Sequence, residues 1–137
     1  MKRTSILFLC TGNSCRSQMA EGWLRHLGGD RFDARSAGVE THGLNPGAVA
    51  AMAEAGVDIR EQRSEHIDDH LADPPDVIVT VCDHAAQSCP TLPETTKVLH
   101  WPFDDPAGVR GDEDYVRSEF RRVRDQIRAR IEAHLVG

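Results

Sequence analysis

The spacing of apolar residues along the chain predicts short strands followed by helices. Residues 5–10, SILFLC, form a nearly continuous apolar run, as expected for a buried strand. A turn rich in Gly, Asn and Ser follows, and a helical pattern then runs as far as Gly28 and Gly29. The apolar positions of this helix are Met19, Trp23, Leu24 and Leu27. The chain therefore begins with a strand, a loop and a helix.

The same alternation continues to the end of the chain. We expect strands at residues 32–37, 76–82 and 97–101, and helices at residues 45–56, 64–71 and from residue 112 onward. Asn45 and Ser64 are the expected caps of the second and third helices, and Gly56 is the expected end of the second. The last helix has one apolar face, made of Val116, Phe120, Val123, Ile127, Ile131 and Leu135.

Strands that alternate with helices predict an α/β fold. We expect residues 1–137 to form a single domain, in which a four-stranded parallel sheet is covered by helices on both faces. In such sheets functional residues gather at the carboxyl ends of the strands. Cys10 follows the first strand, Cys82 the third, and the pair Asp104 and Asp105 the fourth. These side chains are therefore expected to lie close together.

Composition and charge narrow the class of protein. Hydrophobic residues make up 39% of the chain and charged residues 28%, which is typical of a soluble globular protein. The apolar runs are too short to cross a membrane, and we expect no export signal and a cytoplasmic location. With a net charge of -6, no general attraction to nucleic acid or to anionic lipid is expected. A bound anion must therefore be held by a local arrangement of residues.

The segment CTGNSCRS provides such an arrangement. Five residues separate Cys10 from Arg16, between a predicted strand and a predicted helix. A loop of this kind can point its N–H groups at a tetrahedral anion, and the helix adds its positive end. The same field favours a Cys10 thiolate, to which the Ser17 hydroxyl can donate. The expected oxyanion loop is Thr11, Gly12, Asn13, Ser14, Cys15 and Arg16. The simpler alternative is a buried strand-end cysteine followed by a surface arginine.

The sequence also resembles a known family. The stretch CTGNSCRSQMAEGW resembles the loop of the low-molecular-weight tyrosine phosphatase fold, and specifically its thioredoxin-coupled arsenate reductase branch. The resemblance continues through SAGVETHGLNPGAVAAM, VTVCDHAAQSCP and HWPFDDPAG, and so covers nearly the whole chain. The phosphatase branch usually has proline after the serine, where this chain has Gln18. The resemblance implies reduction of arsenate to arsenite in arsenic detoxification, with thioredoxin as the electron donor.

Two further cysteines, Cys82 and Cys89, are separated by DHAAQS. Seven residues of helix advance about 10.5 Å, whereas a disulfide needs Cα atoms within about 7 Å, so a bond between them requires this segment to bend or unwind. The resemblance implies a relay in which Cys82 attacks the Cys10 adduct and Cys89 then attacks Cys82, leaving a disulfide for thioredoxin. Two alternatives remain: buried cysteines without a redox role, and a zinc site formed with Cys10, Cys15 or His84.

The resemblance also implies a proton donor. Asp105, before Pro106, matches the family's Asp-Pro acid, although two adjacent carboxylates before a proline also make an ordinary turn.

Asn13, Glu21 and Ser36 resemble residues that hold a potassium ion in some arsenate reductases. Arg63 stands where those enzymes have a small polar ligand, and its charge is expected to take the cation's place. We therefore expect no tightly bound cofactor and no metal, and we expect the histidines to be surface or structural residues.

The main competing hypothesis is a phosphatase acting on tyrosine phosphate or another phosphomonoester with the same Cys10, Arg16 and Asp105. A phosphatase reaction needs no second thiol. The phosphatase branch tends to place aromatic residues beside the pocket, whereas Tyr115 is the only tyrosine here and Ala and Gly follow Pro106. These features favour a bare inorganic anion, with phosphate and sulfate as competitors and at most a weak phosphatase side activity. A thiol switch or oxyanion sensor without catalysis is the non-enzymatic alternative.

Overall fold

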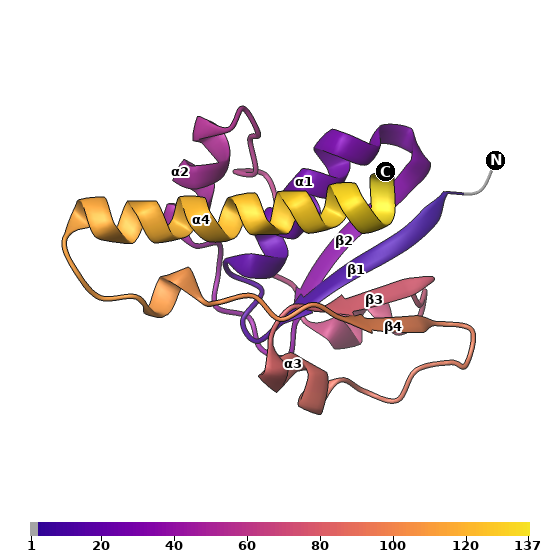
Figure 1. The fold of residues 1–137 in the computed structure, drawn as a ribbon. Helices are drawn as coiled ribbons and strands as arrows, with labels where there is room; N and C mark the ends of the chain where they lie inside the picture. The colour runs from indigo at the N-terminus through magenta and orange to yellow at the C-terminus, as the bar shows by residue number, and fades with distance from the viewer. Residues whose placement is uncertain (1–2) are drawn as a thin grey trace.

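A four-stranded parallel sheet forms the centre of the computed structural model, which describes residues 3–137 (Figure 1). The strand order is β2-β1-β3-β4, and the bounds are Thr4–Cys10 for β1, Phe32–Gly38 for β2, Val77–Thr80 for β3 and Lys97–His100 for β4. Each neighbouring pair runs parallel. All four strands lie where the apolar runs predicted them, although β3 ends two residues before Cys82. The predicted α/β fold class is confirmed.

Helices cover the sheet in two groups. Three of them, α1 (Arg16–Gly28), α2 (Pro46–Glu54) and α4 (Glu113–Ile131), pack against one another. Figure 1 shows these three on one side of the sheet and the short α3 (Asp83–Ser88) on the other. The remaining turns are η1 (Gly29–Arg31), η2 (Ile67–His70), η3 (Pro106–Gly108) and the π-helical η4 (Glu132–Val136).

Local chemistry explains where the predicted helices begin and end. The Asn45 side chain accepts hydrogen bonds from the N–H groups of Gly47 at 2.7 Å and Ala48 at 3.3 Å, so it caps α2 as expected. Asp112 caps α4 in the same way, accepting from the N–H of Tyr115 at 2.9 Å. Gly29, just after α1, has a φ of 54°, which favours glycine at this position.

The predicted helix at residues 64–71 is wrong in both its cap and its length. Only η2 forms, and its cap is His66, whose ring nitrogen accepts from the N–H of Asp68 at 3.0 Å. The Ser64 hydroxyl is engaged elsewhere, because it donates to the carbonyl of Gly12 at 3.1 Å. A residue expected to begin a helix instead supports the loop that follows β1.

One hydrophobic core holds the layers together. Every residue of β1 from Ser5 to Cys10 is buried, so both faces of this central strand are covered. From α4, the side chains of Phe120, Val123, Ile127 and Ile131 are buried, which confirms most of its predicted apolar face. Within residues 3–137, no helix is both long enough and apolar enough to span a membrane.

Candidate active site

The sheet topology brings Cys10 and Cys82 to the same edge. Cys10 ends β1, and Cys82 lies two residues beyond the neighbouring strand β3. The Thr11 hydroxyl lies 3.4 Å from the Cys82 sulfur. A cavity of about 260 Å³ opens beside Cys10, and it is lined by Cys10, Thr11, Gly12, Ser14, Cys15, Arg16, His42, Asp105 and Ala107. The structure thus places Asp105 at the cavity beside Cys10 and Cys82 next to Thr11, but leaves Asp104 outside.

The backbone of residues 10–15 is oriented so that its carbonyl groups point away from the cavity. These six carbonyls accept hydrogen bonds, in chain order, from the N–H groups of Val39, Glu40 and His42, the side-chain amide of Gln18, and the N–H groups of Asn45 and Met19. In the part of the chain that the structure describes, no group accepts from the N–H groups of residues 12–15. Unpaired N–H donors in a loop before a helix form a site for an anion.

Two residues make this loop shape possible. Asn13 has a φ of 47°, in the left-handed region that asparagine tolerates better than most residues. Its side chain points behind the loop, where its oxygen accepts from the N–H of Glu65 at 2.7 Å. A Cβ at Gly12 would collide with the ring of His42, so a larger residue there would require that ring to move. Asn13 therefore shapes the loop through its backbone and supports it from behind, outside the cavity lining.

Cys10 and Ser17 form a buried pair. Cys10 is 3% exposed, and its sulfur lies 2.8 Å from the Ser17 hydroxyl oxygen. That oxygen accepts a hydrogen bond from the Asn13 side-chain amide at 2.9 Å, so its own hydrogen is available to the sulfur. A hydroxyl that donates to a thiolate stabilises the charged form. The geometry suits a nucleophilic thiolate at Cys10.

Arg16 and Asp105 face each other across the cavity. The Arg16 guanidinium donates to the carbonyl of Phe103 at 3.1 Å and lies 3.7 Å from an Asp105 carboxylate oxygen. Asp104, by contrast, pairs with Arg122 at 3.0 Å on the surface and does not line the cavity. Of the two adjacent carboxylates, Asp105 is the one placed to reach an anion held by the loop.

Cys15 is the second cysteine in the loop. It is 4% exposed, and burial, together with the nearby Asp105 carboxylate and Cys10, raises the pKa of its thiol far above the usual range. It therefore stays protonated, and a protonated thiol is a poor nucleophile. Its buried, uncharged side chain suits a role in the shape of the loop.

The other two cysteines flank α3. Cys82 is 6% exposed and occupies the N-cap, where its sulfur accepts from the N–H of Ala85 at 3.4 Å. Cys89 is the C-cap and is partly buried, which raises the pKa of its thiol. All four cysteines are free thiols. Six helical residues, Asp83–Ser88, therefore hold Cys82 and Cys89 apart in this reduced state.

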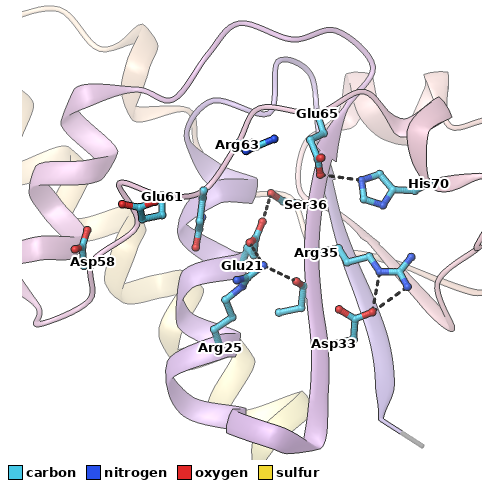
Figure 2. A pocket seen from close by; sticks show the side chains of 12 residues that line it. Glu21, Arg25, Asp33, Arg35, Ser36, Asp58, Glu61, Arg63, Glu65 and His70 are labelled. Carbon is cyan, nitrogen blue, oxygen red and sulfur yellow. Dashed lines mark hydrogen bonds and ion pairs between the residues drawn. The ribbon is translucent and has the colours of Figure 1, made fainter.

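Glu21 and Ser36, two of the residues that resemble potassium ligands, lie around a larger polar pocket of about 460 Å³ (Figure 2). Glu21 already has partners for both carboxylate oxygens: Ser36 donates to one, and the Arg25 guanidinium pairs with the other. Arg63 lines the same pocket, as Figure 2 shows, but the charge beside Glu21 belongs to Arg25. The residues that a cation would need are engaged with groups of the chain itself, so they do not fit a bound potassium.

Sequence reasoning missed two residues near these pockets. His42 lines the cavity beside Cys10, although the histidines were expected to have no part in a site; its N–H also donates to the carbonyl of Gly12 at 2.9 Å. Its position in the loop after β2 was the available signal, because such loops meet at the same sheet edge. Arg25 follows Glu21 by four residues on α1, the spacing at which helical side chains pair.

Comparison with known proteins identifies the family. The model of the low molecular weight phosphotyrosine protein phosphatase family matches residues 5–136. The chain belongs to this family. It is also 53% identical to an arsenate reductase of Halalkalibacterium halodurans over 131 residues, which cover 96% of this chain and 94% of that protein. The predicted resemblance to the arsenate reductase branch of this family is therefore confirmed.

Two solved structures share the fold. An arsenate reductase in its phosphate-binding state superposes with a TM-score of 0.76 at 35% identity, and the match covers 95% of both chains. A thioredoxin-dependent arsenate reductase of Corynebacterium glutamicum superposes with a TM-score of 0.72 at 23% identity, covering 96% of this chain and 61% of that one. At that identity the second likeness shows the fold alone.

Proposed function

We propose that this protein reduces arsenate to arsenite through its cysteines. The observation that carries the proposal is the pairing of an anion loop and its thiol, Cys10, with a second thiol, Cys82, at the same sheet edge. Inorganic arsenate is a tetrahedral anion, which matches the inward N–H groups and the Arg16 guanidinium. The 53% identical relative named an arsenate reductase supports the same substrate.

The first step would bind arsenate in the loop and join it to Cys10. The Cys10 thiolate attacks arsenic, a sulfur–arsenic bond forms, and one arsenic–oxygen bond breaks. Asp105 gives the departing oxygen a proton, so that it leaves as water. Ser17 holds the thiolate before attack, while Arg16 pairs with the remaining oxygens of the anion.

The next steps would move two electrons from thiols to arsenic. The Cys82 thiolate attacks the Cys10 sulfur, so a disulfide forms and the sulfur–arsenic bond breaks, leaving its electron pair on arsenic as arsenite departs. Cys89 then attacks Cys82 and frees Cys10. We propose thioredoxin as the dithiol that reduces the resulting Cys82–Cys89 disulfide; the C. glutamicum enzyme of the same fold is thioredoxin-dependent.

The competing phosphatase function uses only part of this arrangement. Cys10, Arg16 and Asp105 would suffice for a phosphomonoester, and a weak activity of this kind is expected from them. Among the described residues that line the cavity, however, there is no Phe, Tyr or Trp to hold a phenyl ring. A phosphatase also has no use for Cys82 beside the loop. These observations favour arsenate reduction as the main activity.

The test is an arsenate-dependent NADPH oxidation assay with thioredoxin and thioredoxin reductase. Turnover that requires arsenate, this protein and thioredoxin together supports the proposal. Hydrolysis of an aryl phosphate without arsenate-dependent NADPH oxidation would favour the phosphatase. Binding of arsenate with neither reaction would favour an oxyanion sensor.

The Asp105→Asn variant is expected to slow the arsenate-dependent reaction by about 10²-fold, because loss of a general acid typically costs 10² to 10⁴. Asp104→Asn is the matched control: its carboxylate pairs with Arg122 outside the cavity, so its activity should remain near that of the unmodified protein. Steady-state rates in the coupled assay measure both. A larger loss in Asp104→Asn would mean that the other carboxylate is the acid.

Phosphate and sulfate are expected to inhibit arsenate reduction competitively, because the loop holds any tetrahedral anion through the same backbone N–H groups. The apparent KM for arsenate should rise with either anion while kcat stays constant. Initial rates at several arsenate concentrations measure this, with chloride at matched ionic strength as the control. Rates that respond to ionic strength alone would rule out a shared anion site.

A further inference from the structure

Glu21 is a buried carboxylate in the second turn of α1. It is 5% exposed, and burial raises the pKa of its side chain, an effect that its hydrogen bond from Ser36 and the charge of Arg25 oppose. The distance from the Ser36 hydroxyl to one carboxylate oxygen is 2.6 Å. A buried carboxylate that is ionised needs a positive partner, because burial without one is costly.

Arg25 supplies that partner. Its guanidinium lies 2.6 Å from the second Glu21 oxygen and also donates to the carbonyl of Ala34 at 3.2 Å. Figure 2 shows Arg25 reaching up from α1 alongside Glu21, while Glu65 and His70 pair with each other on the far side of the pocket. The guanidinium thus occupies the space between a carboxylate and a backbone carbonyl, two oxygen types that favour hard cations.

Hydrogen bonds link the lining of this pocket to the oxyanion loop. The segment at residues 62–65 lines the pocket, and from it the N–H of Glu65 donates to the Asn13 side-chain oxygen at 2.7 Å. The same Asn13 side chain donates to Ser17 at 2.9 Å, and the Ser17 hydroxyl lies 2.8 Å from the Cys10 sulfur. The Asn13 oxygen, which a cation beside Glu21 would otherwise attract, is held by the backbone.

We propose that Arg25 is a built-in cation. It neutralises Glu21 in place of a monovalent metal ion, while the N–H of Glu65 holds Asn13, so the protein works without a bound potassium. Arg25 is a positioning residue, because it acts on the site only through Glu21, α1 and the loop. Its effect on stability stands independently of the catalytic function, and only its effect on turnover rests on the proposed function.

The test removes the guanidinium and supplies a metal ion instead. Arg25→Ala frees one Glu21 oxygen and the Ala34 carbonyl, and alanine is a good helix former, so α1 should still fold. We expect the thermal midpoint of this variant to rise by roughly 3–6 °C when KCl replaces N-methylglucamine chloride at equal ionic strength, because an ion that binds only the folded state stabilises it. The unmodified protein should show no such difference between the two salts.

Three comparisons make the test specific. Arg25→Lys keeps the charge and should remain indifferent to potassium. Arg35→Ala removes another arginine of the same pocket that pairs with Asp33 and Asp73 and not with Glu21, so it should also be indifferent. Adding Glu21→Gln to Arg25→Ala should abolish the potassium effect. For turnover, potassium should restore kcat in Arg25→Ala and leave that of the unmodified protein unchanged.

Two results would overturn the proposal. One is a potassium effect on the unmodified protein as large as that on Arg25→Ala, since this would mean that a cation site exists beside the guanidinium. The other is an Arg25→Ala variant that folds and is indifferent to potassium in both stability and kcat. Because the thermal midpoint is read without substrate, failure of the arsenate reductase proposal would leave this measurement intact.

Discussion

The Cys10→Ser variant is expected to lose arsenate reduction and any phosphatase side activity, each by more than about 10³-fold, or at least about 4 kcal/mol of transition-state stabilisation. Serine fills the same space but keeps its proton at neutral pH, so neither the loop nor the hydrogen bond from Ser17 can generate a comparable nucleophile. The coupled NADPH assay and hydrolysis of an aryl phosphate measure the two losses separately.

The matched control for this prediction is Cys15→Ser, which changes another buried cysteine in the same loop. Burial keeps the Cys15 thiol protonated, so its replacement should leave most of the activity in both assays. Phosphate binding, measured by calorimetry, should persist in both variants because the backbone N–H groups remain. Near-normal arsenate turnover in Cys10→Ser would end the assignment of Cys10 as the nucleophile.

Much of the fold could be predicted from local sequence because local chemistry decides it. The apolar run at residues 5–10 forms β1, and Asn45 with Pro46 begins α2 as the capping pattern indicated. The helix expected from Ser64 failed for a non-local reason, since the hydroxyl of that residue bonds to the Gly12 carbonyl, 52 positions away. No periodic pattern predicted α3, because a six-residue helix has too few turns to display an apolar face.

In the candidate site too, the residues close together in sequence could be predicted, and those that meet only in the fold were harder to predict. The loop from Cys10 to Ser17 is contiguous, so its spacing and its strand–helix setting could be recognised directly. The sequence already favours Asp105 over Asp104, because Asp105 precedes Pro106. The structure adds the contacts: Asp104 pairs with Arg122, and Asp105 lies 3.7 Å from Arg16. His42 reaches the cavity because β2 ends beside β1, so its signal was its place in the loop after a predicted strand and not a local motif.

Formation of the Cys82–Cys89 disulfide is expected to unwind α3 and to loosen residues 83–96. In the reduced protein the Cys82 carbonyl and sulfur accept from the N–H groups of Ala86 and Ala85, so closing a disulfide across the helix must break these bonds. Seven helical residues advance about 10.5 Å, beyond the roughly 7 Å that a disulfide spans between Cα atoms. Pro90 and Pro93 lie just beyond Cys89 and disfavour helix there. A helix shifted towards residues 90–93 is therefore disfavoured.

The unwinding also has a purpose in the proposed relay. Thiol–disulfide exchange requires the incoming thiolate to approach a disulfide sulfur in line with the bond, yet Cys82 is 6% exposed in the reduced state. Loosening the segment between the two thiols would bring the bond to the surface, where thioredoxin can reach it. The side chains that now hold the start of α3, Asp83 and His100 at 3.0 Å, should separate as it opens.

Hydrogen exchange followed by mass spectrometry measures this change. Oxidised protein should exchange at least about tenfold faster than reduced protein at Ala85 and Ala86, with smaller increases on to Thr96, because an unwound helix loses the bonds that protect its amides. β1 is held on both sides by the sheet ladder and α4 by its own helical hydrogen bonds, so their protection should change little. The double variant Cys82→Ser, Cys89→Ser treated with the same oxidant is the control and should match the reduced protein, because Cys89→Ser alone still has the Cys10 and Cys82 thiols of the relay. Equal exchange of the two states, with the Cys82–Cys89 bond verified by peptide mapping, would show that the disulfide closes without a conformational switch.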